Sequence, residues 1–276
     1  GLRTIAVGLD DADGLGRALQ GIDLVFHAAG PFVHTSDPMI RACLAHGTNY
    51  LDITGEIPVF ANTFTYDRKA IERGVVLLSG VGFDVVPTDC LAAYVARKLP
   101  DATELELAIA GMQGISAGTA KSMFDGGLVG CQVRRDGRLV TVPFGKGARE
   151  LRFDHRTLSA MPIPWGDLET AYRTTGIPNI TTYMTFPPAL VTLSRATSSL
   201  TQAAMPLLRR ALAHAPIKRA IEGALSRVEG PDEAARRRGH SHAWARASTP
   251  DGREYQAWLK TTEGYAFTAT AGVRIV

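Results

Sequence analysis

The sequence contains few cysteines, no long apolar run and no large excess of charge of either sign. Its three cysteines, Cys43, Cys90 and Cys131, lie far apart and lack metal-ligand spacing, which indicates reduced thiols in a cytoplasmic protein. No apolar stretch approaches the roughly 20 residues that a membrane-spanning helix needs. The formal net charge of +3 is weak evidence for nucleic acid as a partner. The seven histidines form no ligand set with cysteines or carboxylates, so we expect no metal site.

The first part of the chain alternates strand and helix patterns. Continuous apolar runs, such as that at 23–28, are typical of strands covered on both faces. Gly47 and Gly74 follow two helical patterns and suit left-handed caps. This alternation predicts a parallel sheet with right-handed crossovers. The expected strands lie at 4–8, 23–28, 49–53 and 75–78, and the expected helices at 13–20, 37–46 (with Pro38 in its first turn) and 58–73.

The pattern changes after Pro100. Residues 104–110 alternate with period two, and Asp136-Gly137 lies at the centre of a strong hairpin signal. A second hairpin pattern follows around residues 250–252. We therefore predict an α/β fold: a partial Rossmann-type, doubly wound parallel sheet at 1–98, followed by an α+β substrate domain at 99–276. The second domain has a mainly antiparallel sheet and a helical insertion at about 196–228.

Three turns follow predicted parallel strands. The carboxyl ends of such strands share one edge of the sheet, where ligands bind in doubly wound folds. A glycine in such a turn lets the backbone approach a ligand closely. The turns contribute the candidate site residues Ala29, Gly30, Pro31 and Phe32, then Gly55 and Glu56, then Gly82, Phe83, Asp84, Pro87 and Asp89.

Each turn also has a simpler interpretation. Gly30-Pro31 could be only a tight turn, Glu56 could cap the following helix as readily as bind a ligand, and Asp89 could cap the helix that begins near Cys90. Asp84 has no such structural task and is the candidate catalytic residue. The convergence of three turns favours a common site.

Several segments together resemble the saccharopine-dehydrogenase-like oxidoreductases, and most closely the branch with the bacterial trans-acting enoyl reductases. They are HAAGPF, ACLAHGTNYLDITGE, SGVGFDVVPTD, AGTAKSMFDGG, PWGDLETAYRTTGIPNITTY and TEGYAFTATA. The resemblance implies an NAD- or NADP-binding Rossmann domain joined to a substrate domain. It implies reduction of a C=C bond, or reduction or oxidation at a C–N bond, of an apolar or lipid-linked substrate. It places Ala29 to Phe32 against the dinucleotide, and Gly55, Glu56 and the turn 82–84 towards the nicotinamide or the substrate, with Pro87 and Asp89 on the substrate side.

The sequence departs from this family at its beginning. No G-x-G-x-x-G opens a helix after a strand, and Gly14 and Gly16 follow acidic residues that would repel a pyrophosphate. By the resemblance, residues 4–10 correspond to the family's third strand, so the first two strands would be absent. Their absence would leave a gap of roughly 14 Å between the third and fourth strands, across which they cannot pair. We therefore expect this chain alone to bind dinucleotide poorly.

The helical pattern at 196–227, interrupted by Pro206 and Pro216, combines leucines and isoleucines with arginines and lysines. It favours an amphipathic helix pair packed on the substrate domain, and a peripheral membrane contact is the sharper alternative. Nucleic-acid binding is disfavoured, since no aromatic stacking platform accompanies the charges. An alternative to an enzyme also stays open. The protein could be a non-catalytic relative, or an inactive remnant, that binds lipid or a protein partner through this helical segment. A homodimer is also open.

Overall fold

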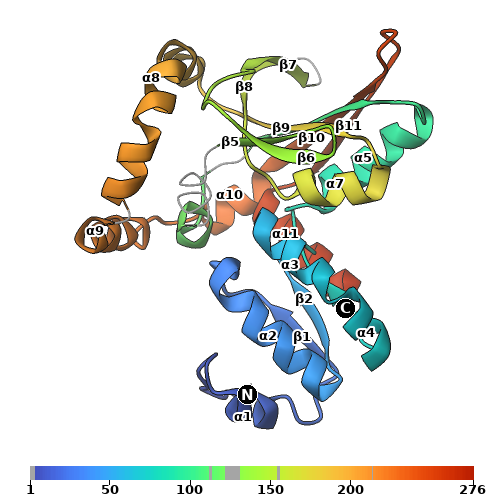
Figure 1. The fold of residues 1–276 in the computed structure, drawn as a ribbon, viewed down its shortest axis with the longest axis vertical. Coiled ribbons are helices and arrows are strands. Elements are labelled where there is room, and N and C mark those ends of the chain that lie inside the picture. The colour runs from blue at the N-terminus through green and yellow to red at the C-terminus, as the bar shows by residue number, and fades with distance from the viewer. Residues whose placement is uncertain (1–3, 112–113, 122–130, 154–155, 213) are drawn as a thin grey trace.

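The computed structural model describes residues 4–111, 114–121, 131–153, 156–212 and 214–276. Within these ranges the chain forms a three-stranded parallel sheet and an eight-stranded mixed sheet. The smaller sheet and its helices lie below the larger sheet in Figure 1. The predicted fold class, an α/β parallel sheet followed by an α+β part, is therefore confirmed.

The smaller sheet has the order β1-β2-β3, and all of its pairs are parallel. Helix α2 packs on this sheet through Ile40 and Cys43, which are wholly buried beside Tyr50. Asp11 caps the first helix by accepting a hydrogen bond from the Gly14 amide at 2.8 Å. The elements are α1 (Ala12–Ala18), β1 (Leu24–His27), α2 (Phe32–His46), β2 (Asn49–Asp52), α3 (Ile57–Thr65), α4 (Asp67–Arg73) and β3 (Leu77–Leu78).

Three expectations for this part were wrong. Residues 4–8 form no strand and pair with none of the described strands. Helix α2 begins at Phe32, so that Pro38 lies inside the helix. The helix expected at 58–73 is two helices, α3 and α4, with a break at Tyr66.

The larger sheet has the order β11-β10-β4-β9-β5-β6, and β8 joins the β7–β8 hairpin to β9. Both predicted hairpins are present, and Asp136 and Gly137 have φ angles of 49° and 73°, as a type I′ turn requires. The pair β4–β9 is parallel and the other pairs are antiparallel. Its strands are β4 (Glu104–Ala110), β5 (Cys131–Arg135), β6 (Arg138–Val142), β7 (Arg149–Phe153), β8 (Arg156–Pro162), β9 (Asn179–Thr185), β10 (His240–Ser248) and β11 (Glu254–Thr262).

One face of the larger sheet is covered by helices α5 (Val86–Lys98) and α7 (Asp167–Thr175). Val95 of α5 and Leu168 of α7 are fully buried there. Helix α11 (Gly264–Ile275) then returns to the smaller sheet, where the Thr268 hydroxyl accepts a hydrogen bond from the Phe83 amide at 3.0 Å. Helices α5 and α11 thus tie the two sheets together, and a domain boundary near residue 98 stays a prediction.

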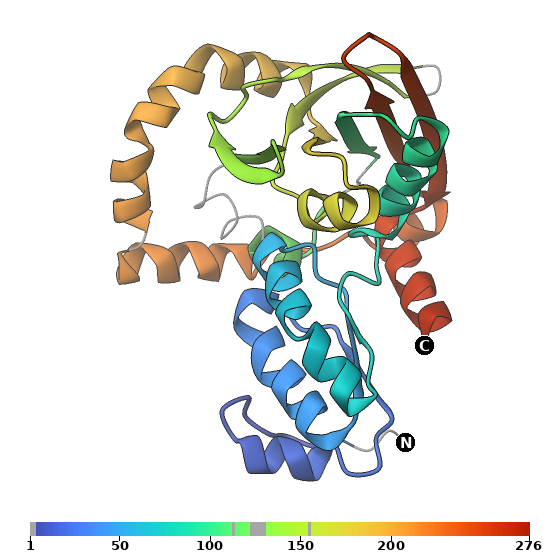
Figure 2. The same ribbon diagram turned by 45° about the vertical axis from the view of Figure 1, so that its right-hand side comes forward.

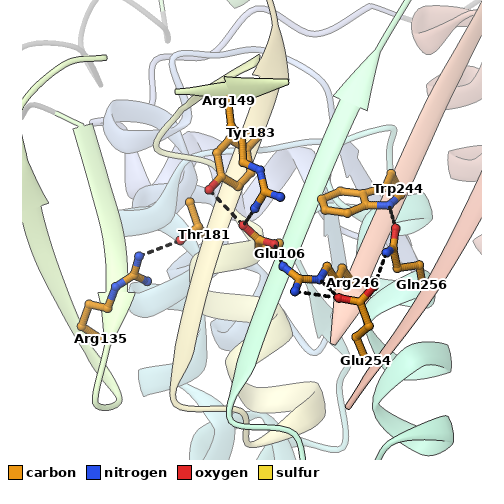
Figure 3. Close-up of polar contacts among 9 residues, drawn as sticks. All are labelled: Glu106, Arg135, Arg149, Thr181, Tyr183, Trp244, Arg246, Glu254 and Gln256. Carbon is orange, nitrogen blue, oxygen red and sulfur yellow. Dashed lines mark hydrogen bonds and ion pairs between the residues drawn. The ribbon is translucent and has the colours of Figure 1, made fainter. Parts of the chain in front are cut away.

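The opposite face of the larger sheet carries a charged network (Figure 3). The Glu106 carboxylate accepts hydrogen bonds from Arg149 at 2.6 Å, Arg246 at 2.8 Å and the Tyr183 hydroxyl at 3.1 Å. Arg246 also pairs with Glu254 at 2.7 Å. Because Glu106 is largely buried, these pairs are screened less than exposed ones, and they join β4, β7, β9, β10 and β11.

A helical arm follows β9 and consists of α8 (Pro188–Leu212) and α9 (Ala215–Leu225). Helix α8 runs on through residue 206, so the expected interruption there was wrong. Pro216 lies in the first turn of α9, directly after the break between the two helices. The short helix α10 (Glu233–Arg238) leads from the arm to β10. None of the described helices is long and apolar enough to cross a membrane.

Candidate active site

The first two predicted turns meet through Glu56. Its carboxylate accepts hydrogen bonds from the amides of Phe32 and Val33, at 2.9 and 2.7 Å. These two amides form the N-terminus of α2, where a negative charge also interacts favourably with the helix dipole. Glu56 therefore does cap a helix, but it is the helix after β1 rather than the one that follows it in sequence. This contact explains why α2 starts five residues earlier than its local pattern predicts.

The second and third turns meet through Asp52, at the end of β2. This carboxylate is fully buried, and four donors surround it. The amides of Thr54 and Gly80 donate at 3.0 Å each, the Tyr50 hydroxyl at 2.9 Å and the Ser79 hydroxyl at 2.8 Å. Burial raises the pKa of Asp52, and these four hydrogen bonds oppose the rise. Asp52 thereby fixes the position of the second turn relative to the third.

His27 extends this network towards the first turn. Its Nδ1 lies 2.9 Å from the Tyr50 hydroxyl. Because that hydroxyl donates its only hydrogen to Asp52, it accepts a hydrogen bond from His27. Burial lowers the pKa of His27, which favours the neutral ring. Sequence reasoning missed this chain of buried polar groups; its one visible signal is the presence of His27, Tyr50 and Asp52 in otherwise apolar strands.

Asp84 lies against the second turn. A Cβ atom built on Gly55 would come within 2.4 Å of the Asp84 Oδ2, so the close approach requires glycine at position 55. Burial raises the pKa of Asp84 to about 7. The three predicted turns therefore share one rim, with Gly30 and Phe32 at the first, Glu56 at the second and Asp84 at the third. A carboxyl group with a pKa near neutrality can act as a general acid or base.

Gly82 and Phe83 pack against the C-terminal helix α11. A Cβ atom on Gly82 would lie 2.8 Å from the Thr268 methyl group. The rings of Phe83 and Phe267 meet edge to face, with centroids 6.1 Å apart. The cofactor-binding role of Ala29, Gly30, Pro31, Phe32, Gly55, Glu56, Gly82 and Phe83 stays a prediction.

A second group of carboxylates lies behind Asp84. Asp167, in the first turn of α7, is fully buried, and burial raises its pKa well above the ordinary value, with the charges of Asp89 and Asp84 raising it further. Among the described residues, no hydrogen bond of good geometry reaches either Asp167 oxygen. The nearby Thr88 hydroxyl donates its hydrogen to the Val85 carbonyl at 3.0 Å, although its proximity lowers the pKa of Asp167 somewhat. Local sequence gives no signal for Asp167.

Asp89 takes part in this group rather than capping α5. The N-cap position of α5 is Val85, and Asp89 lies one turn further on, where it accepts a hydrogen bond from the Thr174 hydroxyl at 2.9 Å. Its other oxygen is buried without a hydrogen-bond partner in the described part of the chain. The capping interpretation of Asp89 was therefore wrong, and the substrate-binding role of Asp89 and Pro87 stays a prediction.

The N-termini of α1 and α2 are both occupied by carboxylates. Asp11 caps α1, with Asp13 in its first turn, and Glu56 accepts from the first amides of α2. A pyrophosphate needs helix-terminal N–H groups without such a competing anion. Glu56 thus competes with a pyrophosphate for the N-terminus of α2, whereas no side-chain hydrogen bond caps α3 or α5. Two surface hollows, of about 740 and 390 Å³, lie elsewhere: one beside Trp258 and Lys260, the other beside Arg41 and Lys69.

Comparison with known proteins confirms the resemblance stated from the sequence. A saccharopine dehydrogenase-like oxidoreductase of Bos taurus is 36% identical over 78 residues, which cover 28% of this chain and 18% of the bovine protein. A Mycobacterium tuberculosis protein with the provisional name trans-acting enoyl reductase is 33% identical over 109 residues, 37% of this chain and 26% of that protein. Each match thus spans only a minor part of the relative's length. No protein-family model matches the chain.

The fold has a solved counterpart. The structure of apo saccharopine dehydrogenase (L-Glu forming) from Saccharomyces cerevisiae aligns with 97% of this chain and 77% of its own, with a TM-score of 0.54. At 9% sequence identity this likeness concerns the fold alone.

Proposed function

We propose that the protein is an oxidoreductase similar to the saccharopine-dehydrogenase-like proteins, dependent on NAD or NADP, and located in the cytoplasm. The described chain would contribute the rim of the parallel sheet and the substrate domain. Two facts support this: the relatives named as oxidoreductases, and the convergence of three turns at the ligand-binding edge of a parallel sheet.

The observation that carries the proposal is the position of Asp84. It lies at the rim with a pKa raised to about 7 by burial, so that near neutral pH a large fraction carries a proton. Reduction of a C=C or C=N bond adds two hydrogens, one of which arrives as a proton. We assign to Asp84 the donation of that proton, and to Gly55 the close packing that holds Asp84 at the rim.

The apolar surroundings of Asp84 favour an apolar or lipid-linked substrate. Its neighbours Phe83 and Val85 belong to a buried cluster with Trp165 and Met184, among others. Such surroundings suit an acyl chain better than a highly charged substrate. The name of the mycobacterial relative, which refers to an enoyl substrate, is in line with this choice.

Dinucleotide binding by this chain alone should be weak, because Glu56 occupies the N-terminus of α2 and the sequence has no G-x-G-x-x-G between a strand and a helix. We expect calorimetric titration of the chain with NADPH to give no binding in the micromolar range. Tight binding would show that the phosphates find another site.

The test of the proposed function is an assay of NADPH oxidation by the complete gene product, with an enoyl thioester and with an imine. Replacement of the candidate acid, Asp84→Asn, should lower turnover at least about 100-fold. The control Asp67→Asn, in the first turn of α4, should leave it unchanged. Equal turnover for Asp84→Asn would remove this residue from the mechanism. No oxidation with either substrate class would favour the alternative, a non-catalytic relative.

A further inference from the structure

The arm formed by α8 and α9 packs on the rest of the protein only at its beginning. Val191 and Ser194, in the first two turns of α8, are each about nine-tenths buried, and Ser194 lies against Gly145. Beyond them, none of the described side chains between 195 and 228 is buried. Figures 1 and 2 both show α8 standing away from the larger sheet and α9 turning back towards α10.

Such a helix is unusual in water. Most of the stability of a helix in a protein comes from packing an amphipathic face, and an isolated helix is marginal even when its sequence is favourable. Helix α8 has 25 residues, yet among its described side chains only those of the first two turns are buried. The arm therefore has an apolar face that a partner outside this chain could cover.

The described apolar residues of α8 gather on one face. Its described members recur at spacings of three, four or eleven residues, which places them on one side of the helix. Leu193 and Leu207 are 60% and 74% exposed, so each leaves more than half of its side chain in water. In α9, Ile217 is 42% exposed. The exposed members on α8 are Leu190, Leu193, Ala204, Leu207 and Ala211.

The charge of the arm indicates which kind of partner it can bind. Between residues 188 and 228 the sequence has six basic residues and a single acidic one. Arg195 and Arg210 are exposed and lie on the side of α8 away from the leucine face. A second copy of the arm would bring two strongly basic segments together, and like charges repel. The segment has no aromatic residue on which nucleic-acid bases could stack.

We propose that the arm α8–α9 lies on an anionic lipid surface, with the leucine face inserted at the boundary between headgroups and acyl chains. Apolar burial and attraction of arginines to acidic headgroups then act together, as in other amphipathic helices that bind membrane surfaces. The chain attaches there peripherally, through the arm. This inference rests on the arm alone and does not depend on the proposed oxidoreductase activity.

The test is flotation of the chain with vesicles of phosphatidylcholine alone or with added phosphatidylserine. The chain should float with the anionic vesicles, and added salt should reduce the bound fraction. The double variant Leu193→Glu, Leu207→Glu should reduce the bound fraction at least about tenfold. A matched control is Ile71→Glu, Val273→Glu, which replaces apolar residues that are 72% and 77% exposed on α4 and α11. Circular dichroism of each variant checks that the helices remain.

Three results would overturn the proposal. The chain could stay unbound with anionic vesicles, or the arm variant could float as well as the control variant. Alternatively, light scattering could reveal a dimer that Leu207→Glu dissociates, which would assign the leucine face to a second copy.

Discussion

Two fully buried aspartates in this protein differ in what surrounds them. Asp52, at the end of β2, accepts hydrogen bonds from four donors. Asp167, at the start of α7, has no hydrogen bond of good geometry within the described residues, and its closest charged neighbours are also carboxylates. Both side chains have zero exposed surface, so burial alone cannot distinguish their roles.

The difference shows how donors decide the charge state of a buried carboxyl group. Burial disfavours the ionised form in both cases. At Asp52 four hydrogen bonds oppose that effect, whereas at Asp167 neighbouring carboxylates add to it. Asp52 can therefore serve as a fixed joint between turns. Burial favours the protonated form of Asp167, and its ionised form would add negative potential beside Asp84. The region around Asp52 suits a structural task, and that around Asp84 and Asp167 suits proton transfer.

The largest expected loss of stability concerns Asp52, whose carboxylate accepts four hydrogen bonds. Asp52→Ala leaves two hydroxyls and two amides without their acceptor in a buried place, so we expect the free energy of unfolding to fall by about 4 kcal/mol. Urea unfolding measures it. The control Asp101→Ala removes only an exposed ion pair with Arg253 and should lower the free energy of unfolding by at most about 1 kcal/mol. If both variants lose the same free energy of unfolding, the four hydrogen bonds to Asp52 contribute no more than an exposed ion pair, and Asp52 is not a structural joint.

The contact between Gly55 and Asp84 gives a smaller effect. Gly55→Ala would place a Cβ atom 2.4 Å from the Asp84 Oδ2, and the shift needed should lower the free energy of unfolding by about 2 kcal/mol. Gly223→Ala is the matched control, because nothing lies within 4 Å of its added Cβ in helix α9. In an Asp84→Ala background the loss from Gly55→Ala should fall by more than half, as a double-mutant cycle would measure. An unchanged loss would mean that Asp84 does not lie against Gly55.

Local patterns in the sequence were enough to predict some elements of the fold. The alternation at 104–110 and the Asp136-Gly137 turn each specify a structure through neighbouring residues, and both were correct. The start of α2 was not predictable in this way, because the carboxylate that holds Phe32 lies 24 residues away, at Glu56. The parallel pairing of β4 with β9 likewise joins segments far apart in the chain.

The candidate site was likewise predictable only in part. The meeting of three turns followed from the rule that parallel strands end at one edge, and Gly30, Glu56 and Asp84 do lie along one rim. Asp167 comes from the larger sheet's helix α7, and no pattern around it indicates a buried carboxyl group. Its proximity to Asp84 arises only when the two parts of the chain pack together.

A pH-dependent effect is expected at Asp167, the buried carboxyl group that no hydrogen bond of good geometry reaches among the described residues. The pKa of Asp167 in the folded protein lies well above its ordinary value, so between these values the folded state holds a proton that the unfolded state has released. Stability due to this group is therefore complete at acidic pH and falls as pH rises. Asp167→Asn removes this titration while keeping the size of the side chain. The variant should be about as stable as the native protein near pH 4, and its free energy of unfolding should exceed the native value increasingly towards pH 8. If urea unfolding instead shows a constant difference across this range, Asp167 has partners that stabilise its charge, and the distinction from Asp52 disappears.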